Sequence, residues 1–595
     1  MKDSSKNNQQ SFLRQTGEKG GRLELVTPTV TKEGKHDLKV ETIDEPKKEK
    51  KRTNVVILGG GIAGLALSFE LLKQPNYNVT ILEAENYLGG RCLTLRPGDS
   101  FREFTNGIEQ TCRFDTNGVT GVPYLNAGPG RIPSGHRNVI NYCKALNVEL
   151  EVYVMESRSN LMKTIEGFGG TTITDRRLAN DPRGYFAEYL YQNGAAFLNY
   201  MNDRRSDEEK LNNDDIENLK KWLVEFGALD KEGKYQGSSR SGYKKLPGTG
   251  EGIIEPPLPF KDILKSVFWD LNFYQPEEFL WQDTSFQPVG GMDKIVHALE
   301  HEVRRNRGTI HLNAPVHNIK RSDNQWDIMY GDKKTIAADI CVSNIPIPLL
   351  SGKVIKEDFS ANYWKALSKV METKDFLRPT CKVGWQSDRK YWQNPLDEQT
   401  VPVFGGISRI SPNRMEQMWY PSNDYNDNTG ILTGAYNYGI NAKEWGEELP
   451  EKRMEEARIG AAKLHGEEFS RQLRHGLSIA WQNIEYQQGG WVDWKKVDEE
   501  LETFKTEDWV NYERVKNMPL EIEPEIGSSA WCYNELQKQD NGFFITGDQV
   551  SKLPGWQEGA IASALQIYGL LEYPDHIFPL KLYRVPSARV LVEGR

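Results

Sequence analysis

One short stretch near residue 55 constrains the fold of this chain more than any other. Val55 to Leu58 is an uninterrupted apolar run, which is typical of a parallel strand buried on both faces. The turn GGGIAG, residues 59–64, follows, and after it come a helical run from Leu65 to Lys73 and a second apolar run from Val79 to Leu82. This order predicts a βαβ unit and therefore a parallel sheet covered by helices.

The same turn has the chemistry of a dinucleotide-binding site. Gly59, Gly61 and Gly64 have the GxGxxG spacing, which gives a tight turn, close approach of the backbone to a pyrophosphate and close packing of helix on strand. The amides and the positive dipole end of the next helix favour phosphate. Glu83 ends the second strand, where it can bind ribose hydroxyls. A purely structural glycine turn is the alternative, but the strand, the helix and the acid together favour dinucleotide binding.

Composition excludes several classes of protein. The 75 basic and 84 acidic residues are spread along the 595-residue chain, so there is no clustered basic face for nucleic acid. The six cysteines form no CxxC pair, which argues against a disulfide scaffold or a zinc site and favours a reducing compartment. We therefore expect a cytoplasmic protein, with secretion by a route without a signal peptide left open. No apolar run reaches 18 residues, so no membrane span is expected.

The chain is too long for one simple core, and its pattern suggests several parts. The polar first 53 residues end in KKEKKR and are expected to be a mobile tail or a pro-segment. Helix signals follow residue 132: Ser134 can cap one helix, and Asp214 with Glu217 has capping-box spacing before another. We expect a discontinuous cofactor domain (54–131, 286–345 and 520–573), a helical domain (132–285), a substrate domain (346–519) and a C-terminal extension (574–595).

The residues after Glu83 extend the cofactor site and carry the first resemblance to a known family. Gly89-Gly90-Arg91 look like a second pyrophosphate clamp, and ILEAENYLGGRC resembles the strand-and-loop signature of the flavin amine oxidase superfamily. That resemblance implies FAD as the cofactor, with Gly90 and Arg91 near its pyrophosphate and flavin. It also implies an α/β fold with a Rossmann-type FAD-binding domain, a mixed-sheet substrate domain and a helical insertion.

A second stretch narrows the resemblance. GPGRIPSGHRNVINYCKAL is similar to the Gly-x-x-Arg-x-Pro loop and the following helix of L-amino-acid oxidases. The resemblance implies that Arg131 forms a forked ion pair with the α-carboxylate of the substrate, a geometry that guanidinium matches. From spacing alone, a surface ion-pair arginine would be the better interpretation. Gly130, which we assign to the cofactor site, stands where these oxidases more often carry a larger residue.

The end of the chain resembles the closing motif of the superfamily. By its match to FFITGDQVSKLPGWQEGAIASALQ, Asp548 faces the ribityl-phosphate part of FAD, and Gly555 with Trp556 lies beside the flavin, Trp556 stacking on the substrate. Gln557 begins the helix whose amides would reach the O2/N3 edge of the flavin. A merely structural Trp556 is the weaker interpretation, since it lies between glycine and polar residues.

Three further residues follow from the resemblance. Lys382 in TCKVGWQSDRKYW matches the lysine near flavin N5 that is tied to reaction with oxygen. Tyr420 in RMEQMWYPS matches a tyrosine that donates to the substrate carboxylate, and Val316 in APVHNI lies near the adenine. Nothing resembles the cysteine segment that links flavin covalently in monoamine oxidases, so the FAD is expected to be non-covalent.

These motifs together indicate an L-amino-acid oxidase acting with molecular oxygen, expected as a homodimer. It would convert L-amino acids to 2-oxo acids with release of ammonia and hydrogen peroxide, and the number of Trp and Tyr residues favours bulky apolar or aromatic substrates. An amine or polyamine oxidase, or a decarboxylating amino-acid monooxygenase, on the same fold is the alternative. A flavoprotein subunit without turnover is least favoured, because it would not need Lys382 or Trp556.

Overall fold

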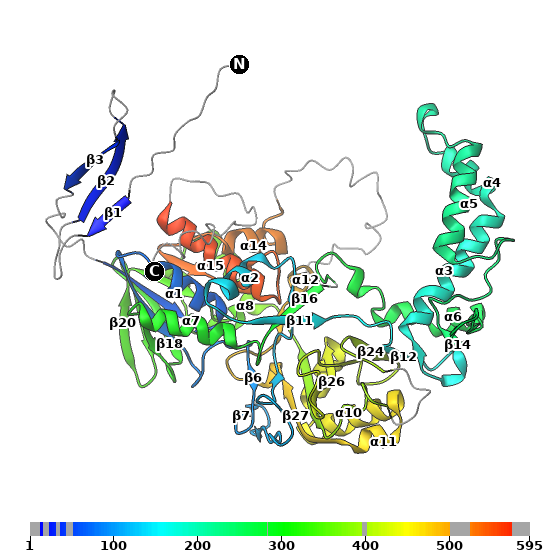
Figure 1. The fold of residues 1–595 in the computed structure, drawn as a ribbon. Helices are drawn as coiled ribbons and strands as arrows, with labels where there is room; N and C mark the ends of the chain where they lie inside the picture. The colour runs from blue at the N-terminus through cyan, green and yellow to red at the C-terminus, as the bar shows by residue number, and fades with distance from the viewer. Residues whose placement is uncertain are drawn as a thin grey trace. The chain divides into compact units, whose positions relative to one another are not determined.

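The computed structural model describes residues 12–15, 23–30, 36–42, 52–282, 284–395, 402–499 and 524–573 (Figure 1). The chain divides into two compact units, Met1–Thr53 and Asn54–Arg595. The predicted C-terminal extension, residues 574–595, lies outside the described residues. In the described part of the chain, no helix is long and apolar enough to cross a membrane.

The first unit contains a small antiparallel sheet. Its strands are β1 (Phe12–Gln15), β2 (Leu23–Val30) and β3 (His36–Thr42), paired in the order β1-β2-β3. We expected a mobile tail or a pro-segment here; the three paired strands differ from a mobile tail, and the pro-segment stays a prediction. Apolar and polar residues alternate in parts of them, and this period of two predicts strands even though the polar composition of the whole stretch hides it.

The second unit is built on the predicted parallel sheet. Its strand order is β17-β5-β4-β21-β29, and β17 pairs with β5 in parallel, as β4 and β29 do with β21. Alternate side chains of β4 enter two different cores, because neighbouring residues of a strand point to opposite faces: Val55 and Ile57 into one, Val56 and Leu58 into the other. The five strands are β4 (Thr53–Leu58), β5 (Tyr77–Leu82), β17 (Thr309–His311), β21 (Ile340–Ser343) and β29 (Phe543–Ile545).

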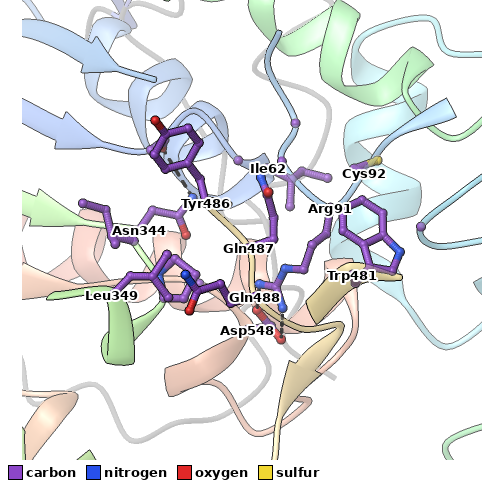
Figure 2. A pocket seen from close by; sticks show the side chains of 18 of the residues that line it. Ile62, Arg91, Cys92, Asn344, Leu349, Trp481, Tyr486, Gln487, Gln488 and Asp548 are labelled. Atoms are coloured by element: carbon purple, nitrogen blue, oxygen red, sulfur yellow. Dashed lines mark hydrogen bonds and ion pairs between the residues drawn. The ribbon is translucent and has the colours of Figure 1, made fainter. Parts of the chain in front are cut away.

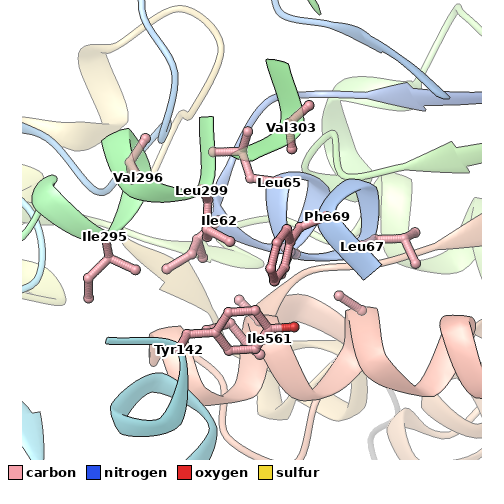
Figure 3. Close-up of a cluster of buried hydrophobic side chains, with 14 of the residues drawn as sticks. Ile62, Leu65, Leu67, Phe69, Tyr142, Ile295, Val296, Leu299, Val303 and Ile561 are labelled. Atoms are coloured by element: carbon pink, nitrogen blue, oxygen red, sulfur yellow. The ribbon is translucent and has the colours of Figure 1, made fainter. Parts of the chain in front are cut away.

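Helices cover one face of this sheet. The helix after the glycine turn, α1 (Ile62–Leu72), packs between α7 (Lys294–Arg305) and α15 (Gln557–Glu572), and α2 (Arg137–Ala145) packs against α15. Figure 3 shows the result, with apolar side chains of α1, α7 and α15 meeting in one buried cluster. The start of α1 is thereby fixed at the carboxyl end of β4, where a phosphate-binding turn must lie.

The other face carries a second layer. Strands β18 (Val316–Ser322), β19 (Gln325–Tyr330) and β20 (Lys334–Ala338) form an antiparallel sheet, and helix α8 (Ala361–Glu372) packs against α14 (Ser529–Leu536). Their apolar residues share a core with Val56 and Leu58.

A seven-stranded mixed sheet forms the second half of this unit. Its order is β13-β12-β24-β25-β26-β23-β27, with β12 parallel to β24 and every other described pairing antiparallel. Strand β23, which lies between β26 and β27, is buried at every position, so any polar side chain on it needs a partner or a function. The strands are β12 (Leu161–Lys163), β13 (Ile173–Thr174), β23 (Thr380–Ser387), β24 (Ile407–Ile410), β25 (Gln417–Trp419), β26 (Gly430–Tyr438) and β27 (Leu473–Ala480), covered by α9 (Ile440–Glu447), α10 (Pro450–His465) and α11 (Glu467–Arg471).

The predicted helical range 132–285 contains helices and strands. Its helices, besides α2, are α3 (Asp175–Gln192), α4 (Gly194–Asn202), α5 (Asn213–Gly227) and α6 (Phe260–Ser266). The cap of α5 is Asn212 with Asp215, not Asp214 with Glu217, because the Asn212 side chain accepts from the amides of Asp214 and Asp215. His136 occupies the cap position of α2, and Ser134 instead donates to Gln282. Strands β10 (Ile132–Pro133) and β11 (Leu150–Val154) flank β16 (Thr284–Pro288) in a three-stranded sheet.

Candidate active site

Two cavities meet between the parallel sheet and the mixed sheet. The first, of about 560 Å³, is lined by residues from Glu83 and Val316 to Lys382 and Trp556. Figure 2 shows part of it, with Arg91, Asn344 and Asp548 among its lining side chains. The second, of about 310 Å³, contains Arg131. Both cavities are lined by Gly128, Pro129, Lys382, Tyr436, Trp491, Gly555, Trp556 and Gln557.

The glycine turn prepares the start of α1 for a phosphate. Gly61 occupies the cap position, yet no side chain caps the helix and its first turn holds no acidic residue, so the amides and the positive dipole end are not neutralised locally. A Cβ on Gly61 would lie 2.7 Å from Asn344 Nδ2, and one on Gly64 would lie 2.4 Å from the carbonyl oxygen of Gly59. Gly59 and Gly61 line the first cavity, whereas Gly64 serves the packing of helix on strand.

Glu83 lies at the end of β5 on the wall of the first cavity. Its carboxylate accepts hydrogen bonds from the amides of Gly60 (2.6 Å) and Glu85 (2.9 Å), which fix its orientation. Burial raises the pKa of Glu83, and these amide bonds oppose the rise. Val316, the first residue of β18, lines the same end of the cavity. This end therefore offers a fixed carboxylate acceptor next to an apolar wall, which suits a ribose and a base.

Arg91 and Asp548 form an ion pair on the opposite wall. Arg91 Nη2 lies 2.5 Å from Asp548 Oδ1, and Arg91 Nη1 donates to the carbonyl of Gly490 at 2.8 Å (Figure 2). Asp548 also accepts from the Gly555 amide at 2.9 Å, so it connects Arg91 to the loop that holds Trp556. Gly90, Arg91 and Asp548 all line the first cavity.

The groups along the first cavity fit a dinucleotide cofactor. A carboxylate, an open helix start, a guanidinium and apolar walls follow one another in a single elongated space. Gln557 begins α15 and donates through Nε2 to Cys92 Sγ at 2.9 Å, so its side chain is held against the cavity wall. Among the described residues, no group of three or more His, Cys, Asp or Glu is placed to hold a metal ion.

Lys382 points from β23 into the wall that the two cavities share. Its Nζ donates to the carbonyl oxygens of Asn126 (3.1 Å) and Gly128, and it lies 4.9 Å from the centre of the Tyr436 ring. No carboxylate is bonded to it within the described part of the chain. Burial, and then the positive charge of Arg131, lower the pKa of Lys382 to about 7. The side chain is thus positioned by neutral acceptors and can change its charge near neutral pH.

Arg131 is a buried cation that is surrounded by three tryptophan rings. Its guanidinium carbon lies 4.3 Å from the ring centre of Trp281, 5.0 Å from that of Trp556 and 5.1 Å from that of Trp419. Its Nε and Nη2 are buried and have no hydrogen-bond partner among the described residues. Burial lowers the pKa of Arg131 to about 10. The aromatic faces stabilise the cation in part, but the described part of the chain supplies no anion to it there.

Tyr420 lines the second cavity with Arg131, and its hydroxyl is already hydrogen-bonded within the protein. Its hydroxyl donates to Ser408 Oγ (2.8 Å) and is 2.5 Å from His465 Nε2, within a core of the mixed sheet. Trp419, the last residue of β25, faces Arg131 with its ring. The role of Tyr420 as a donor to a carboxylate stays a prediction, and two other tyrosines line the same cavity.

Tyr153 and Tyr436 are the tyrosines whose pKa values respond to Arg131. Burial raises the pKa of both, and the charge of Arg131 opposes the rise. Both line the second cavity, and Tyr436 lines the first as well. Sequence reasoning missed them, together with Trp281 and Trp419, because their approach to Arg131 depends on the register of strands far apart in the chain.

Gly130 and His136 also lie at the second cavity. Gly130 lines the second cavity and not the first, and a Cβ built on it would meet nothing within 4 Å. The absence of a side chain there leaves room beside Arg131. The His136 ring packs edge-on against Trp556 at 4.8 Å, and burial lowers its pKa to about 4. His136 therefore supports Trp556 as a neutral ring at physiological pH.

The geometry can now be compared with known proteins. The sequence profile of the family described as flavin containing amine oxidoreductase matches residues 62–567. The chain belongs to this family. The match confirms the predicted mixed α/β fold, and membership implies a flavin cofactor and oxidation of a small amine or amino acid with oxygen.

Individual relatives are distant. YobN of Bacillus subtilis (strain 168), named as a candidate L-amino-acid oxidase, is 22% identical over 535 residues, covering 86% of this chain and 93% of its own. The L-amino acid oxidase bordonein-L of Crotalus durissus terrificus is 23% identical over 65% of this chain and 67% of its own. A structure of wild-type putrescine oxidase bound to putrescine aligns with a TM-score of 0.51 at 13% identity, covering 88% of this chain and 99% of that one, and shows the fold alone.

Proposed function

We propose that this protein oxidises L-amino acids to 2-oxo acids, with release of ammonia and hydrogen peroxide, using non-covalent FAD. The observation that carries the proposal is the buried guanidinium of Arg131, whose Nε and Nη2 have no hydrogen-bond partner among the described residues. It borders the wall that the two cavities share. A buried cation without an anion is costly for a protein, so its presence beside the flavin site needs a functional reason.

The carboxylate of an amino acid supplies the missing partner. Guanidinium and carboxylate form two parallel, charge-assisted hydrogen bonds, and the pair is strongest where water is excluded. The three tryptophans around Arg131 exclude water and surround the guanidinium, whose unpartnered N–H groups remain for the substrate. Tyr153 or Tyr436 takes the role of second donor that the sequence analysis gave to Tyr420.

The shared wall then orients the reacting end of the substrate. When bound, FAD accepts a hydride from the substrate and passes the electrons to oxygen. Trp556 and Gly555 lie between the cavities, so a carboxylate at Arg131 directs the α-carbon toward the cofactor side. Lys382, held by two backbone carbonyls, places one ionisable group at this junction.

The assignment of non-covalent FAD can be tested on the purified protein. Gly59, Gly61, Glu83 and Arg91 line one cavity with the open start of α1, and this set supports FAD rather than a mononucleotide. Purified protein should be yellow, and acid precipitation should leave FAD in the supernatant. Flavin that remains in the pellet would contradict non-covalent binding.

The alternative enzyme functions differ in whether their substrate has a carboxylate that Arg131 can bind. An amine or polyamine oxidase binds a cationic substrate that has no carboxylate, and a buried cation beside the site would repel it. The likeness to putrescine oxidase shows the fold alone, so it does not favour this alternative. A decarboxylating monooxygenase would use the same carboxylate contact but would form an amide.

One experiment separates these functions. The protein is incubated with each of the twenty L-amino acids and with their decarboxylated amines, and peroxide, 2-oxo acid and amide are measured. The proposal expects peroxide and 2-oxo acid from amino acids only. Equal turnover of the amines, or an amide product, would refute it.

A further inference from the structure

The sheet β10-β16-β11 lines up three polar side chains beside the second cavity. Ile132 pairs with Phe286, so Arg131 lies next to Gln287, which pairs with Glu151 on the other side. Directly paired residues of antiparallel strands point to the same face. Val152 is 62% exposed whereas Tyr153 lines the cavity, so Glu151, two residues from Tyr153, also faces inward.

Gln287 is held in one orientation by Glu151. Its Nε2 donates to Glu151 Oε1 at 2.9 Å, and an ionised carboxylate can only accept. One of the two N–H groups of the amide is therefore used, and this bond turns the carbonyl oxygen of Gln287 away from Glu151, where it can contact a substrate. Gln287 is buried and lines the second cavity.

Tyr124 adds a second oxygen to the same cavity. Its side chain is 7% exposed, and its hydroxyl has no hydrogen-bond partner among the described residues. Burial, and after it the charges of Glu151, Asp424 and Asp293, raise the pKa of this hydroxyl, and the charge of Arg96 opposes the rise. Arg96 is already paired with Asp293 through two bonds of 2.7 Å, which leaves the surroundings of Tyr124 acidic.

We propose that this wall, formed by Tyr124, Gln287 and Glu151, selects L-amino acids whose side chain ends in a cation, such as lysine, ornithine or arginine. This inference rests on the proposed function, because it assumes that the α-carboxylate is held by Arg131. Two oxygen atoms accept from the cationic end, and Glu151 supplies the opposite charge behind Gln287. Neutral amide side chains fit less well, since they carry no charge to pair with that of Glu151.

The spacing of the strands agrees with a long side chain. Arg131 and Glu151 are two strands apart, about 10 Å at the usual spacing. The expectation of bulky apolar substrates was based on the number of Trp and Tyr residues, but three of the tryptophans surround Arg131 rather than this wall. Their presence is explained by the carboxylate contact.

The test compares L-lysine with L-norleucine, which lacks the terminal ammonium. We expect wild-type kcat/KM to be higher for L-lysine, and Glu151→Gln to lower the lysine-to-norleucine ratio by about tenfold or more. Glu149→Gln is the matched control, because Glu149 is exposed, precedes the same strand and loses the same charge. Under anaerobic conditions, L-lysine should also raise the melting temperature of the wild-type holoenzyme more than L-norleucine does, and less so in Glu151→Gln.

The outcomes distinguish the two proposals. Preference of the wild type for L-norleucine, or equal effects of Glu151→Gln and Glu149→Gln on the ratio, would overturn this inference and leave the L-amino-acid oxidase proposal intact. Oxidation of no L-amino acid would overturn both. If Glu151→Gln fails to fold, Tyr124→Phe replaces it, and an unchanged ratio in that variant overturns the inference.

Discussion

Replacing Arg131 by methionine tests two effects of its charge: the stability that the folded protein loses by burying it, and the substrate binding that it provides. Methionine keeps a long, unbranched side chain for Trp281, Trp419 and Trp556 to pack against, and it removes the guanidinium. The variant should bind flavin normally, because Arg131 does not line the first cavity. It should lose most of its activity on L-amino acids.

The magnitude follows from the burial of Arg131. A guanidinium whose pKa falls from 12.5 to about 10 costs the folded state roughly 3 kcal/mol, at about 1.4 kcal/mol for each pH unit. A substrate carboxylate that pairs with it recovers this amount, which is on the order of 100-fold in kcat/KM. The general cost of truncating a desolvated charge pair, about 2–5 kcal/mol, includes this value. Substrate-free protein should gain stability or be unchanged, since the unpaired charge is gone.

The assay measures kcat/KM by peroxide release and the free energy of unfolding by urea denaturation. Arg137→Met is the control, because Arg137 is exposed on α2 and only six residues away. Arg131→Lys should fail almost as badly as Arg131→Met, because an ammonium cannot form the fork. The reasoning would be refuted by an Arg131→Met variant that keeps its activity on amino acids, or by one that is destabilised by several kcal/mol in the absence of substrate.

Three more outcomes can be checked. In the folded state the Lys382 ammonium is fully charged only below pH 7, whereas the unfolded chain still binds the proton between pH 7 and about 10. The free energy of unfolding of the wild type should therefore rise, relative to that of Lys382→Met, by about 1.4 kcal/mol per pH unit over this range. Urea denaturation across pH measures this difference. Gly64→Ala forces a Cβ against a backbone carbonyl and should cost about 1–3 kcal/mol and lower the flavin content, which absorbance reports, whereas Gly121→Ala meets nothing and serves as control. Arg453→Met leaves the fully buried carboxylate of Glu103 without its 2.6 Å partner and should destabilise by about 3–5 kcal/mol in thermal unfolding; a loss below about 1 kcal/mol would contradict the pairing.

The parallel sheet could be predicted because its signals are local. A strand buried on both faces is a continuous apolar run, and the glycine turn marks where it ends, so Val55–Leu58 and Val79–Leu82 could be assigned directly. The sheet in the first unit was missed because residues 1–53 are polar on average, and the average hides short alternating segments. The strands between residues 132 and 285 were missed because helix signals dominate that range.

Some residues of the candidate site could also be predicted from local motifs, whereas others depend on how distant strands pair. Glu83 and Arg91 belong to motifs whose own backbone sets their positions, so both could be placed on the cavity from sequence. Choosing between Trp419 and Tyr420 requires the register of β25, because a shift of one residue turns every side chain to the other face. Gln287 and Glu151 likewise lie side by side only because β16 pairs with β11, and no local sequence pattern predicts that pairing.

The two cavities share part of their lining, so a substitution can affect one cavity or both, depending on its position. A substitution at Trp556 or Tyr436 touches the cofactor side and the substrate side at once, so its effects on redox chemistry and on substrate choice are coupled. Tyr124 and Gln287 border the second cavity alone. A substitution at Tyr124 or Gln287 therefore changes the lining of the second cavity and leaves the lining of the first unaltered.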